Sequence, residues 1–490
     1  MGIFAVYDTV GIQNYVFASN KLSENVGASR LVHRLFNDSE KKQGLLPEQI
    51  CLAGGRADWK NNTDKGLDEN IPAEIVYSGG GNAYVAYRDE QTFQAVTEGF
   101  LREVYKATHA VGVAVAAVET SFSDSYQEDY KTLMNRLRLA KGFTNRPVAA
   151  GNQPVTRQSA RTGLPVSRFY EGEWMDEAAY LKREERKAVG TGGIKEFEDL
   201  VVEKGRDSFI AIIHVDGNNM GIAIANEIKD AQNYSEAVPK MRRLSKAIDT
   251  AFEQSRKEAL GIFEAYYKEH PDFKERYEKK GLPVIDLIAD GDDTTQIVSG
   301  RFGLSYASLL LRAIEQAASP FADGSMLAAC AGVTLCHSHY PFSDAYRIAE
   351  ECCASAKKPS RSNPGSYIDF QLIQAGAVSD LRSIRENQFT LDGETLIARP
   401  WAITEGISER PAFSWFEKRQ LDLAANWPKS RLKNLRNALG SSKVEASEEY
   451  SQSESRGYGL PDDFEENRRE YFDVLELMDV FEDITKEVQA

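Results

Sequence analysis

The chain has 490 residues, of which 42% are hydrophobic and 27% charged, and its formal net charge is −15 at pH 7. This composition is typical of a globular protein with two to four domains. No apolar run approaches the roughly 18 residues of a membrane span, and the start MGIFAVYDTV lacks the features of a signal peptide. Five cysteines without a CxxC pair indicate a reducing compartment and argue against a structural zinc site. We therefore expect a cytoplasmic protein that uses neither a membrane nor zinc.

The charge is unevenly distributed along the chain. Residues 441–490 carry fifteen acidic and five basic side chains, which accounts for most of the net charge. Residues 131–170 carry no acidic side chain and eight basic ones: Lys131, Arg136, Arg138, Lys141, Arg146, Arg157, Arg161 and Arg168. A local field of this sign suits phosphates or RNA. The alternative is a solvated basic face without a ligand.

The first 147 residues predict a small unit of strands and helices. A strand ends near Asp8 in FAVYDTVG, and EIVYSGGGNAYVAY at 74–87 predicts a hairpin with a glycine-rich turn. A further strand begins at Gly112, followed by a Phe-Ser-Asp loop, a helix and an Ala-Lys pair. Residues 148–206 then predict a connecting module of Gly- and Pro-containing loops with one charged helix.

Residues 207–380 predict a second unit of the same kind. It has the strand FIAIIHV, a long helix, the hairpin PVIDLIADGDDTTQIV, a helix, the strand LAACAGVTLC and a helix ending in Ala-Lys-Lys. The remainder, 381–490, is expected to be mainly helical, with a mobile loop around 445–459.

The two units are diverged copies of one module, here called the first and second copy. The Phe-Ser-Asp-x-Tyr motifs at 122–126 and 342–346 are 220 positions apart, and Asp8 and Asp216 each end an apolar strand. The order βαββαβ predicts a ferredoxin-like unit, an antiparallel sheet backed by helices on one face. The predicted fold class is therefore α+β, with two ferredoxin-like domains, a small linker module and a C-terminal helical domain.

Three aspartates of the second copy are expected to converge. Asp216 ends the first strand, and Asp292 and Asp293 lie in the tight turn of ADGDDTT. The first strand and the hairpin are neighbours in this fold, so the carboxylates would be neighbours too. Oxygen ligands select hard cations such as Mg²⁺ or Mn²⁺, and two such ions clamp the attacking and leaving oxygens of a nucleotidyl transfer. An acidic turn is weak evidence alone, and Asp216 is also compatible with a helix cap.

Further residues are candidates for binding nucleotide or phosphate. The strand-to-helix turn GNNMG offers backbone N–H groups to phosphate oxygens, and basic side chains after the last helix would neutralise a triphosphate. The candidates in the second copy are Gly217, Asn218, Gly221, Gly291, Lys357 and Arg361. The first copy lacks the acidic turn, so we expect it to bind a second nucleotide without catalysis. Its candidates are Asp8, Gly79, Gly80, Gly81, Asn82, Lys141 and Arg146.

These motifs resemble the large, polymerase-like subunit of type III CRISPR effector complexes, which has two palm domains related to GGDEF cyclases. DTVGIQNYVFAS and YSGGGNAYV are similar to its first palm, and DGNNMG and ADGDD to its second, where the usual turn is Gly-Gly-Asp-Asp. The resemblance spans residues 1 to about 375. It implies that two ATP molecules bind between the palms and are joined into cyclic oligoadenylates, messengers that activate antiviral defence when target RNA is bound.

The resemblance also implies partners: guide or target RNA, and other effector subunits. The chain departs from the family pattern in three ways. Asp290 replaces the first glycine of the turn, Asn218 stands where some members have a second aspartate, and no His-Asp pair marks an HD nuclease domain. We therefore expect a compact form without that nuclease. Two alternatives stay open: a catalytically silent RNA-binding scaffold, and a standalone cyclase that makes another cyclic nucleotide.

Overall fold

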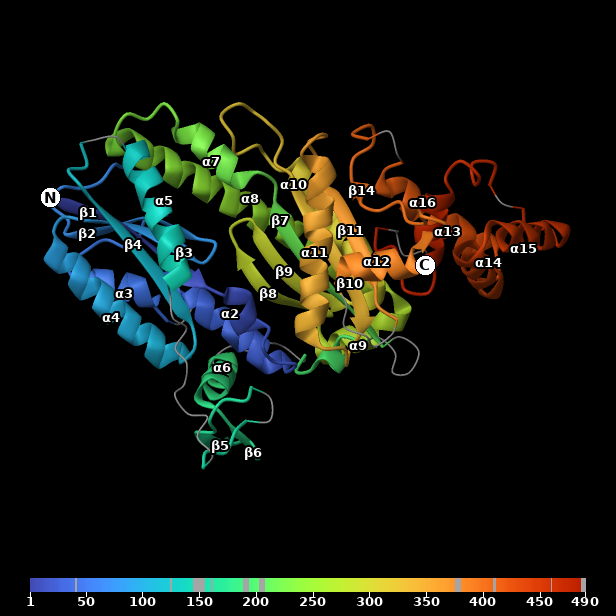
Figure 1. The fold of residues 1–490 in the computed structure, drawn as a ribbon, viewed down its shortest axis with the longest axis horizontal. Helices are drawn as coiled ribbons and strands as arrows, with labels where there is room; N and C mark the ends of the chain where they lie inside the picture. Colours follow the sequence, from blue (N-terminus) through green and yellow to red (C-terminus); the bar gives the residue numbers. More distant parts are fainter. Residues whose placement is uncertain are drawn as a thin grey trace.

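Two β-sheets lie side by side in the computed structural model, and the C-terminal helices extend from the second sheet (Figure 1). The structure describes residues 1–39, 42–123, 126–143, 155–159, 162–187, 194–201, 208–374, 380–408, 411–459 and 461–485. Within these residues, no helix is both long and apolar enough to cross a membrane. The mixed α+β class with two palm-like sheets is confirmed.

The first copy forms a four-stranded antiparallel sheet in the order β2-β3-β1-β4. Its strands are β1 (Gly2–Val10), β2 (Ala73–Gly79), β3 (Asn82–Tyr87) and β4 (Gly112–Thr120). Its helices are α1 (Ile12–Val16), α2 (Leu22–Phe36), α3 (Leu45–Leu52), α4 (Glu90–Thr108) and α5 (Tyr126–Phe143).

The second copy forms a six-stranded sheet in the order β14-β11-β10-β7-β9-β8. Its strands are β7 (Phe209–Gly217), β8 (Val284–Asp290), β9 (Asp293–Ser299), β10 (Ala329–His337), β11 (Tyr367–Leu372) and β14 (Trp401–Ala402). Its helices are α7 (Met220–Ile228), α8 (Tyr234–Glu269), α9 (Pro271–Lys280), the 3₁₀ turn η2 (Gly300–Phe302), α10 (Gly303–Gln316) and α11 (Phe342–Ser360).

The two sheets repeat the same pairing. β2-β3-β1-β4 and β8-β9-β7-β10 have the same strand order. Asp8 pairs with Asn82 in the first copy, and Asp216 pairs with Asp293 in the second. Each hairpin also has a register shift at the same distance from its turn. The repeat predicted from the sequence is therefore present down to individual residue pairs.

The expectation that helices back each sheet on one face is wrong. Phe4 of β1 packs against Tyr126 of α5, whereas Tyr7 packs against Phe100 of α4, so α5 and α4 cover opposite faces. β7 shows the same division between α11 and α10. In Figure 1, α5 and α11 cross in front of their sheets. The sequence pattern missed this because strands covered on both faces lose their alternation of polar and apolar residues.

The strands β11 and β14 were not predicted. β11 runs parallel to β10, and β14 pairs with β11. The segment YIDFQL of β11 is buried throughout and includes Asp369, whose carboxylate is bound by Arg385 at 2.6 Å. A short apolar run with a charged residue does not look like a buried strand. The sequence pattern does not show that Arg385, in a later helix, pairs with Asp369 and makes its burial possible.

The connecting module contains β5 (Arg168–Tyr170), β6 (Glu173–Met175), α6 (Glu177–Lys187) and the 3₁₀ turn η1 (Phe197–Asp199). The C-terminal elements are α12 (Leu381–Gln388), β12 (Thr390–Leu391), β13 (Glu394–Thr395), α13 (Phe413–Asn426), α14 (Lys429–Ser441), α15 (Lys443–Ser455) and α16 (Arg468–Glu476).

The prediction of a mobile loop around 445–459 is wrong, because most of this segment forms α15. The side chain of Ser442 caps this helix by accepting a hydrogen bond from the N–H of Glu445. Glu449 then forms an ion pair with Arg431 of α14 at 3.1 Å. Polar composition alone favoured disorder, but a capped helix that packs on a neighbour needs few apolar residues.

Helix α8 belongs to both copies. Its first turn packs on the first sheet, where the rings of Tyr234 and Phe4 are 5.4 Å apart. Its C-terminal half packs in the second copy, where Phe263 contacts Tyr306 of α10. A single helix of 36 residues therefore runs from one sheet to the other.

Arg242, in the N-terminal half of α8, fixes this helix to the first copy. Its side chain is fully buried and forms an ion pair with Glu74 at 3.0 Å. β2 is the edge strand of its sheet, so its outward carbonyl groups need donors from elsewhere. Arg242 donates to four backbone carbonyl groups at 2.8–3.2 Å, those of Asn62, Lys65, Ile75 and Val76.

Replacing Arg242 by alanine is expected to lower the free energy of unfolding by about 3–5 kcal/mol, because four backbone carbonyl groups lose their donor and buried Glu74 keeps only Arg56 and the N–H of Asp68. Chemical denaturation measures this change. The matched control is Arg243→Ala, whose side chain is 53% exposed and pairs with Asp64. Its expected effect is below about 1 kcal/mol. Equal losses in both variants would contradict the role assigned to Arg242.

Candidate active site

The structure brings Asp216, Asp292 and Asp293 to one end of the second sheet. Asp216 lies at the end of β7 and pairs with Asp293, the first residue of β9. Asp292 lies in the turn between β8 and β9, and its carbonyl group accepts a hydrogen bond from the N–H of Gly217 at 3.3 Å. Two segments more than seventy residues apart thus place three carboxylates together.

The turn after β7 is shaped by its small residues. A Cβ on Gly217 would lie 2.8 Å from the Cβ of Asp292, so only glycine allows this approach. Asn219 adopts a left-handed conformation with φ 57°, which starts α7. Asn218 donates from Nδ2 to the carbonyl of Gly365 at 3.0 Å, whereas its Oδ1 is buried and has no hydrogen-bond donor among the described residues. Gly221 is exposed in the first turn of α7.

Lys357 of α11 is the cation at this site. Its Nζ lies 2.6 Å from Oδ2 of Asp216 and 3.1 Å from the carbonyl oxygen of Gly217. The phosphate contact predicted for Lys357 stays a prediction, and in the structure its ammonium group pairs with Asp216. Arg361 lies one turn further on, exposed at the C-terminal cap of α11.

The turn carboxylates hold protons unusually tightly. Burial, reinforced by the charge of Asp216, raises the pKa of Asp292 to about 6 and that of Asp293 to about 8. The Nδ1 of His214 lies 3.5 Å from Oδ1 of Asp293. Burial lowers the pKa of His214 to about 4, so at neutral pH the imidazole carries no positive charge that would balance the carboxylates. The Oδ1 of Asp293 is buried without a hydrogen-bond donor among the described residues.

These features fit a cation site that must lose protons before it fills. Among the residues that the structure describes, no three His, Cys, Asp or Glu side chains already have the spacing of a metal site. However, one oxygen of Asp293 has no hydrogen-bond donor among the described residues, and burial and the neighbouring carboxylates raise the pKa of Asp293, so a bound cation would stabilise the ionised turn. Carboxylate oxygens are the ligands that Mg²⁺ and Mn²⁺ prefer. Asp292, Asp293 and the second oxygen of Asp216 could therefore hold such an ion.

The first copy keeps part of this arrangement. Lys141 of α5 lies 2.8 Å from Asp8, which mirrors the pair of Lys357 and Asp216. Burial raises the pKa of Asp8, and Lys141 opposes this shift. Asn82 stands at the position equivalent to Asp293. Asp8 is the one carboxylate that the first copy itself provides at the positions equivalent to Asp216, Asp292 and Asp293, which is too few for two divalent ions.

The turn of the first copy is formed by Gly79, Gly80 and Gly81. Gly80 and Gly81 have φ values of 61° and 76°, which explains why glycine is needed at both. The Oδ1 of Asn82 is buried without a hydrogen-bond donor among the described residues. Arg146, the remaining candidate of this copy, lies outside the described residues.

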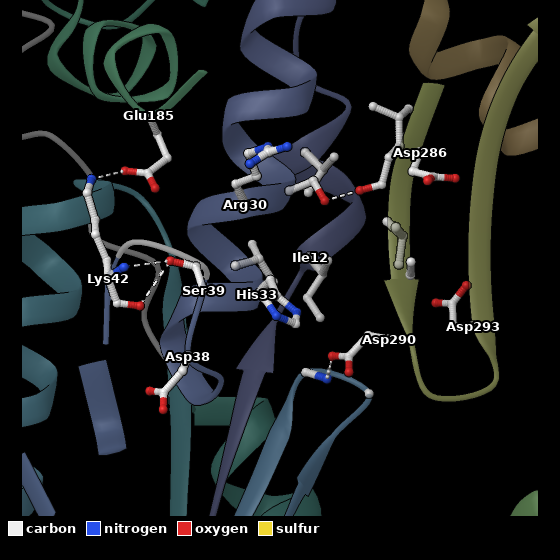
Figure 2. A pocket seen from close by; sticks show the side chains of 18 residues that line it. Ile12, Arg30, His33, Asp38, Ser39, Lys42, Glu185, Asp286, Asp290 and Asp293 are labelled. Atoms are coloured by element: carbon white, nitrogen blue, oxygen red, sulfur yellow. Dashed lines mark hydrogen bonds and ion pairs between the residues drawn. The ribbon is translucent and has the colours of Figure 1, made fainter. Parts of the chain in front are cut away.

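A pocket of about 410 Å³ lies between the two copies. Figure 2 shows Arg30 and His33 of α2 facing strand β8 across it, with Asp293 at one side and Asp290 near the glycine turn. Its walls are partly apolar and its rim carries charge of both signs. The sequence analysis missed the α2 residues, because nothing in a helix far from the hairpin in sequence signals that it faces β8.

Asp290 lies where the two turns meet. Its Oδ2 accepts a hydrogen bond from the N–H of Gly81 at 3.2 Å. Burial raises the pKa of Asp290, while His33 and the N–H groups of Gly81 and Gly80 oppose this shift. The carboxylate of Asp290 therefore points toward the first copy. The sequence did not predict this direction.

Comparison with known proteins agrees with this geometry. Residues 209–364 match the family model for the second palm domain of Cas10/Cmr2. The predicted resemblance to the polymerase-like subunit of type III CRISPR complexes is confirmed. No curated protein matches the chain in sequence.

Solved Csm1 structures share the fold of almost the whole chain. The Csm1-Csm4 cassette in complex with cA3 has a TM-score of 0.55 at 11% identity, covering 98% of this chain and 69% of that chain. The cassette in complex with AMPPNP has a TM-score of 0.51 at 14% identity, covering 98% and 70%. Csm1 of T. onnurineus has a TM-score of 0.52 at 13% identity, also covering 98% and 70%. The three carboxylates lie within residues 209–364, the segment that matches the family model of the second palm domain.

The raised pKa of Asp293 predicts a specific pH dependence of stability. An aspartate has a pKa near 3.9 when unfolded and about 8 here, so it destabilises the metal-free protein as the pH rises through this range. Asp293→Asn is therefore expected to raise the melting temperature of the metal-free protein at pH 8 and to leave it nearly unchanged below pH 4. Thermal melts in the presence of a chelator measure this difference. An increase of the same size at both pH values would contradict the assignment.

Proposed function

We propose that this chain is a metal-dependent nucleotidyltransferase that joins ATP molecules into cyclic oligoadenylates, as a signalling subunit of a type III CRISPR complex. The convergence of Asp216, Asp292 and Asp293 beside Lys357 carries the proposal. The membership of residues 209–364 in the Cas10/Cmr2 palm family supports it. A cytoplasmic location stays a prediction from the cysteine content.

In this proposal Asp292 and Asp293 hold the divalent ions, assisted by Asp216. Bound Mg²⁺ or Mn²⁺ would stabilise the charge that develops on the transferring phosphoryl group and activate the attacking hydroxyl. Lys357 would move from Asp216 to the phosphates once the ions neutralise that carboxylate, because an ammonium group binds either partner as a point charge. The turn after β7 would offer its N–H groups to phosphate oxygens at the start of α7.

The second nucleotide would lie against the first copy. The pocket between α2 and β8 opens toward both turns and has partly apolar walls, as a nucleobase requires. The pair of Asp8 and Lys141 would contribute a phosphate contact without a metal. Preference for adenine comes from the family alone.

The decisive experiment is incubation of the purified protein with ATP or GTP and Mn²⁺ or Mg²⁺, with products identified by mass spectrometry. Asp292→Ala combined with Asp293→Ala is expected to lower product formation at least about 100-fold, because the metal ligands are lost. Asp272→Ala, on the exposed start of α9, is the matched control and should retain activity. Undiminished turnover in the double variant would show that the metal assignment is wrong.

The alternative of a silent RNA-binding scaffold predicts no product with or without RNA. It draws support from the basic stretch at 131–170, of which Lys131, Arg136 and Arg138 are exposed on α5. The assay is therefore repeated with RNA and partner subunits. Product that forms only under these conditions would show that an activator was missing, and no product would favour the silent scaffold.

RNA binding itself can be tested through Arg157, whose guanidinium lies 5.2 Å from the exposed ring of Trp174. Arg157→Glu is expected to weaken RNA binding several-fold and to reduce its salt dependence by about one charge. Arg161, another basic residue of the 131–170 stretch, lies outside the described residues. Fluorescence anisotropy with labelled RNA measures the change, with Arg102→Glu on α4 as control. Wild-type affinity in the Arg157 variant would favour a solvated basic face.

A further inference from the structure

Asp290 joins the acidic turn of the second copy to the glycine turn of the first. It is the last residue of β8, and its carboxylate accepts from the N–H of Gly81 at 3.2 Å (Figure 2). A glycine at this position, as in the usual Gly-Gly-Asp-Asp turn, has no side chain and could not make this contact.

Both backbone polar groups of Gly81 are hydrogen-bonded, one in each of the two peptide units that flank its Cα. Its carbonyl group accepts a hydrogen bond from the N–H of Thr9 in β1 at 2.9 Å, and its N–H is taken by Asp290. Its φ of 76° favours glycine, because a side chain in this conformation is strained, and a Cβ on Gly81 would also lie 2.5 Å from Cδ1 of Ile12. Asp290 therefore supplies one of the two hydrogen bonds that hold Gly81 in the glycine turn.

The same strand contacts the first copy at a second point. The hydroxyl of Ser29 in α2 donates to the carbonyl group of Leu287. β8 is the edge strand of its sheet, and Ser29 gives one of its backbone carbonyl groups a donor from outside that sheet. Asp290 is the contact nearer the carboxylates, since it pairs directly with Asp293 and closes the turn.

We propose that Asp290 is a positioning residue that sets the spacing between the glycine turn of the first copy and the catalytic turn of the second. This inference rests on the proposed function, because it concerns the approach of the two nucleotides that those turns would hold. Small displacements of reacting groups lower the rate more than they lower binding. Loss of the contact should therefore reduce kcat for ATP more than it changes KM.

The first test needs no catalysis. Hydrogen exchange of the amide of Gly81 is measured in the protein without nucleotide, for wild type, Asp290→Gly and Asp290→Asn. Asparagine keeps an acceptor oxygen, so we expect wild-type protection in Asp290→Asn and exchange about tenfold faster in Asp290→Gly. Asp64→Asn, at an exposed ion pair of the first copy, is the control and should leave this amide unchanged. Unchanged protection in Asp290→Gly would overturn the inference.

The second test uses the ATP assay on the same proteins, with melting temperatures to verify that each is folded. Asp290→Gly is expected to lower kcat about tenfold with KM nearly unchanged, and Asp290→Asn to restore most of the rate. Wild-type kinetics in Asp290→Gly, a higher rate, or equal losses in both variants would overturn the positioning role. If wild type itself makes no product under any condition, the proposed function fails, whereas the exchange experiment still decides whether Asp290 holds the turn.

Discussion

The buried guanidinium of Arg242 links the two copies and sets their relative position. It lies on a helix that continues into the second sheet, and its partners are a carboxylate and backbone carbonyl groups at the edge of the first. Two of the acceptors, the carbonyl groups of Ile75 and Val76, are part of the backbone of β2. The contact therefore holds the strand itself in place against α8. β2 leads directly to the glycine turn, and α8 leads through α9 to strand β8. Arg242 thus joins the two elements that lead to the turns.

The two copies of the module have the same strand pairing but different residues in their turns. Strand order, register and the lysine–aspartate pair recur in both. The difference is concentrated in the turns, where SGGGN in one copy corresponds to DGDD in the other. A glycine turn gives close access to a ligand, whereas an acidic turn attracts cations. In the proposed function, the glycine turn would bind one nucleotide and the acidic turn would activate the other.

The acidic turn is costly for the protein without ligand. Burial and mutual repulsion raise the pKa values of Asp292 and Asp293, and one oxygen of Asp293 lacks a donor among the described residues. Lys357 pairs with Asp216 and offsets only part of the rise in the pKa of Asp292. Charge that a fold does not balance internally is typical of a site built for a charged ligand. The same reasoning separates this cluster from Asp369, whose carboxylate is fully satisfied by Arg385.

The sequence by itself determined the repeat, the order of strands and helices in each copy, and the meeting of Asp216 with the hairpin. These follow from local patterns of apolar residues and turns, because adjacent strands of a ferredoxin-like sheet must place those positions side by side. Only the tertiary structure decided which face α5 and α11 cover, the added strands β11 and β14, the pairing of Lys357 with Asp216 and the direction of Asp290. Each of these depends on contacts between segments far apart in the chain, such as Gly81 with Asp290 and Arg242 with β2. Residue patterns carry no record of such contacts, since the free energy that selects them arises only when both surfaces are folded and packed.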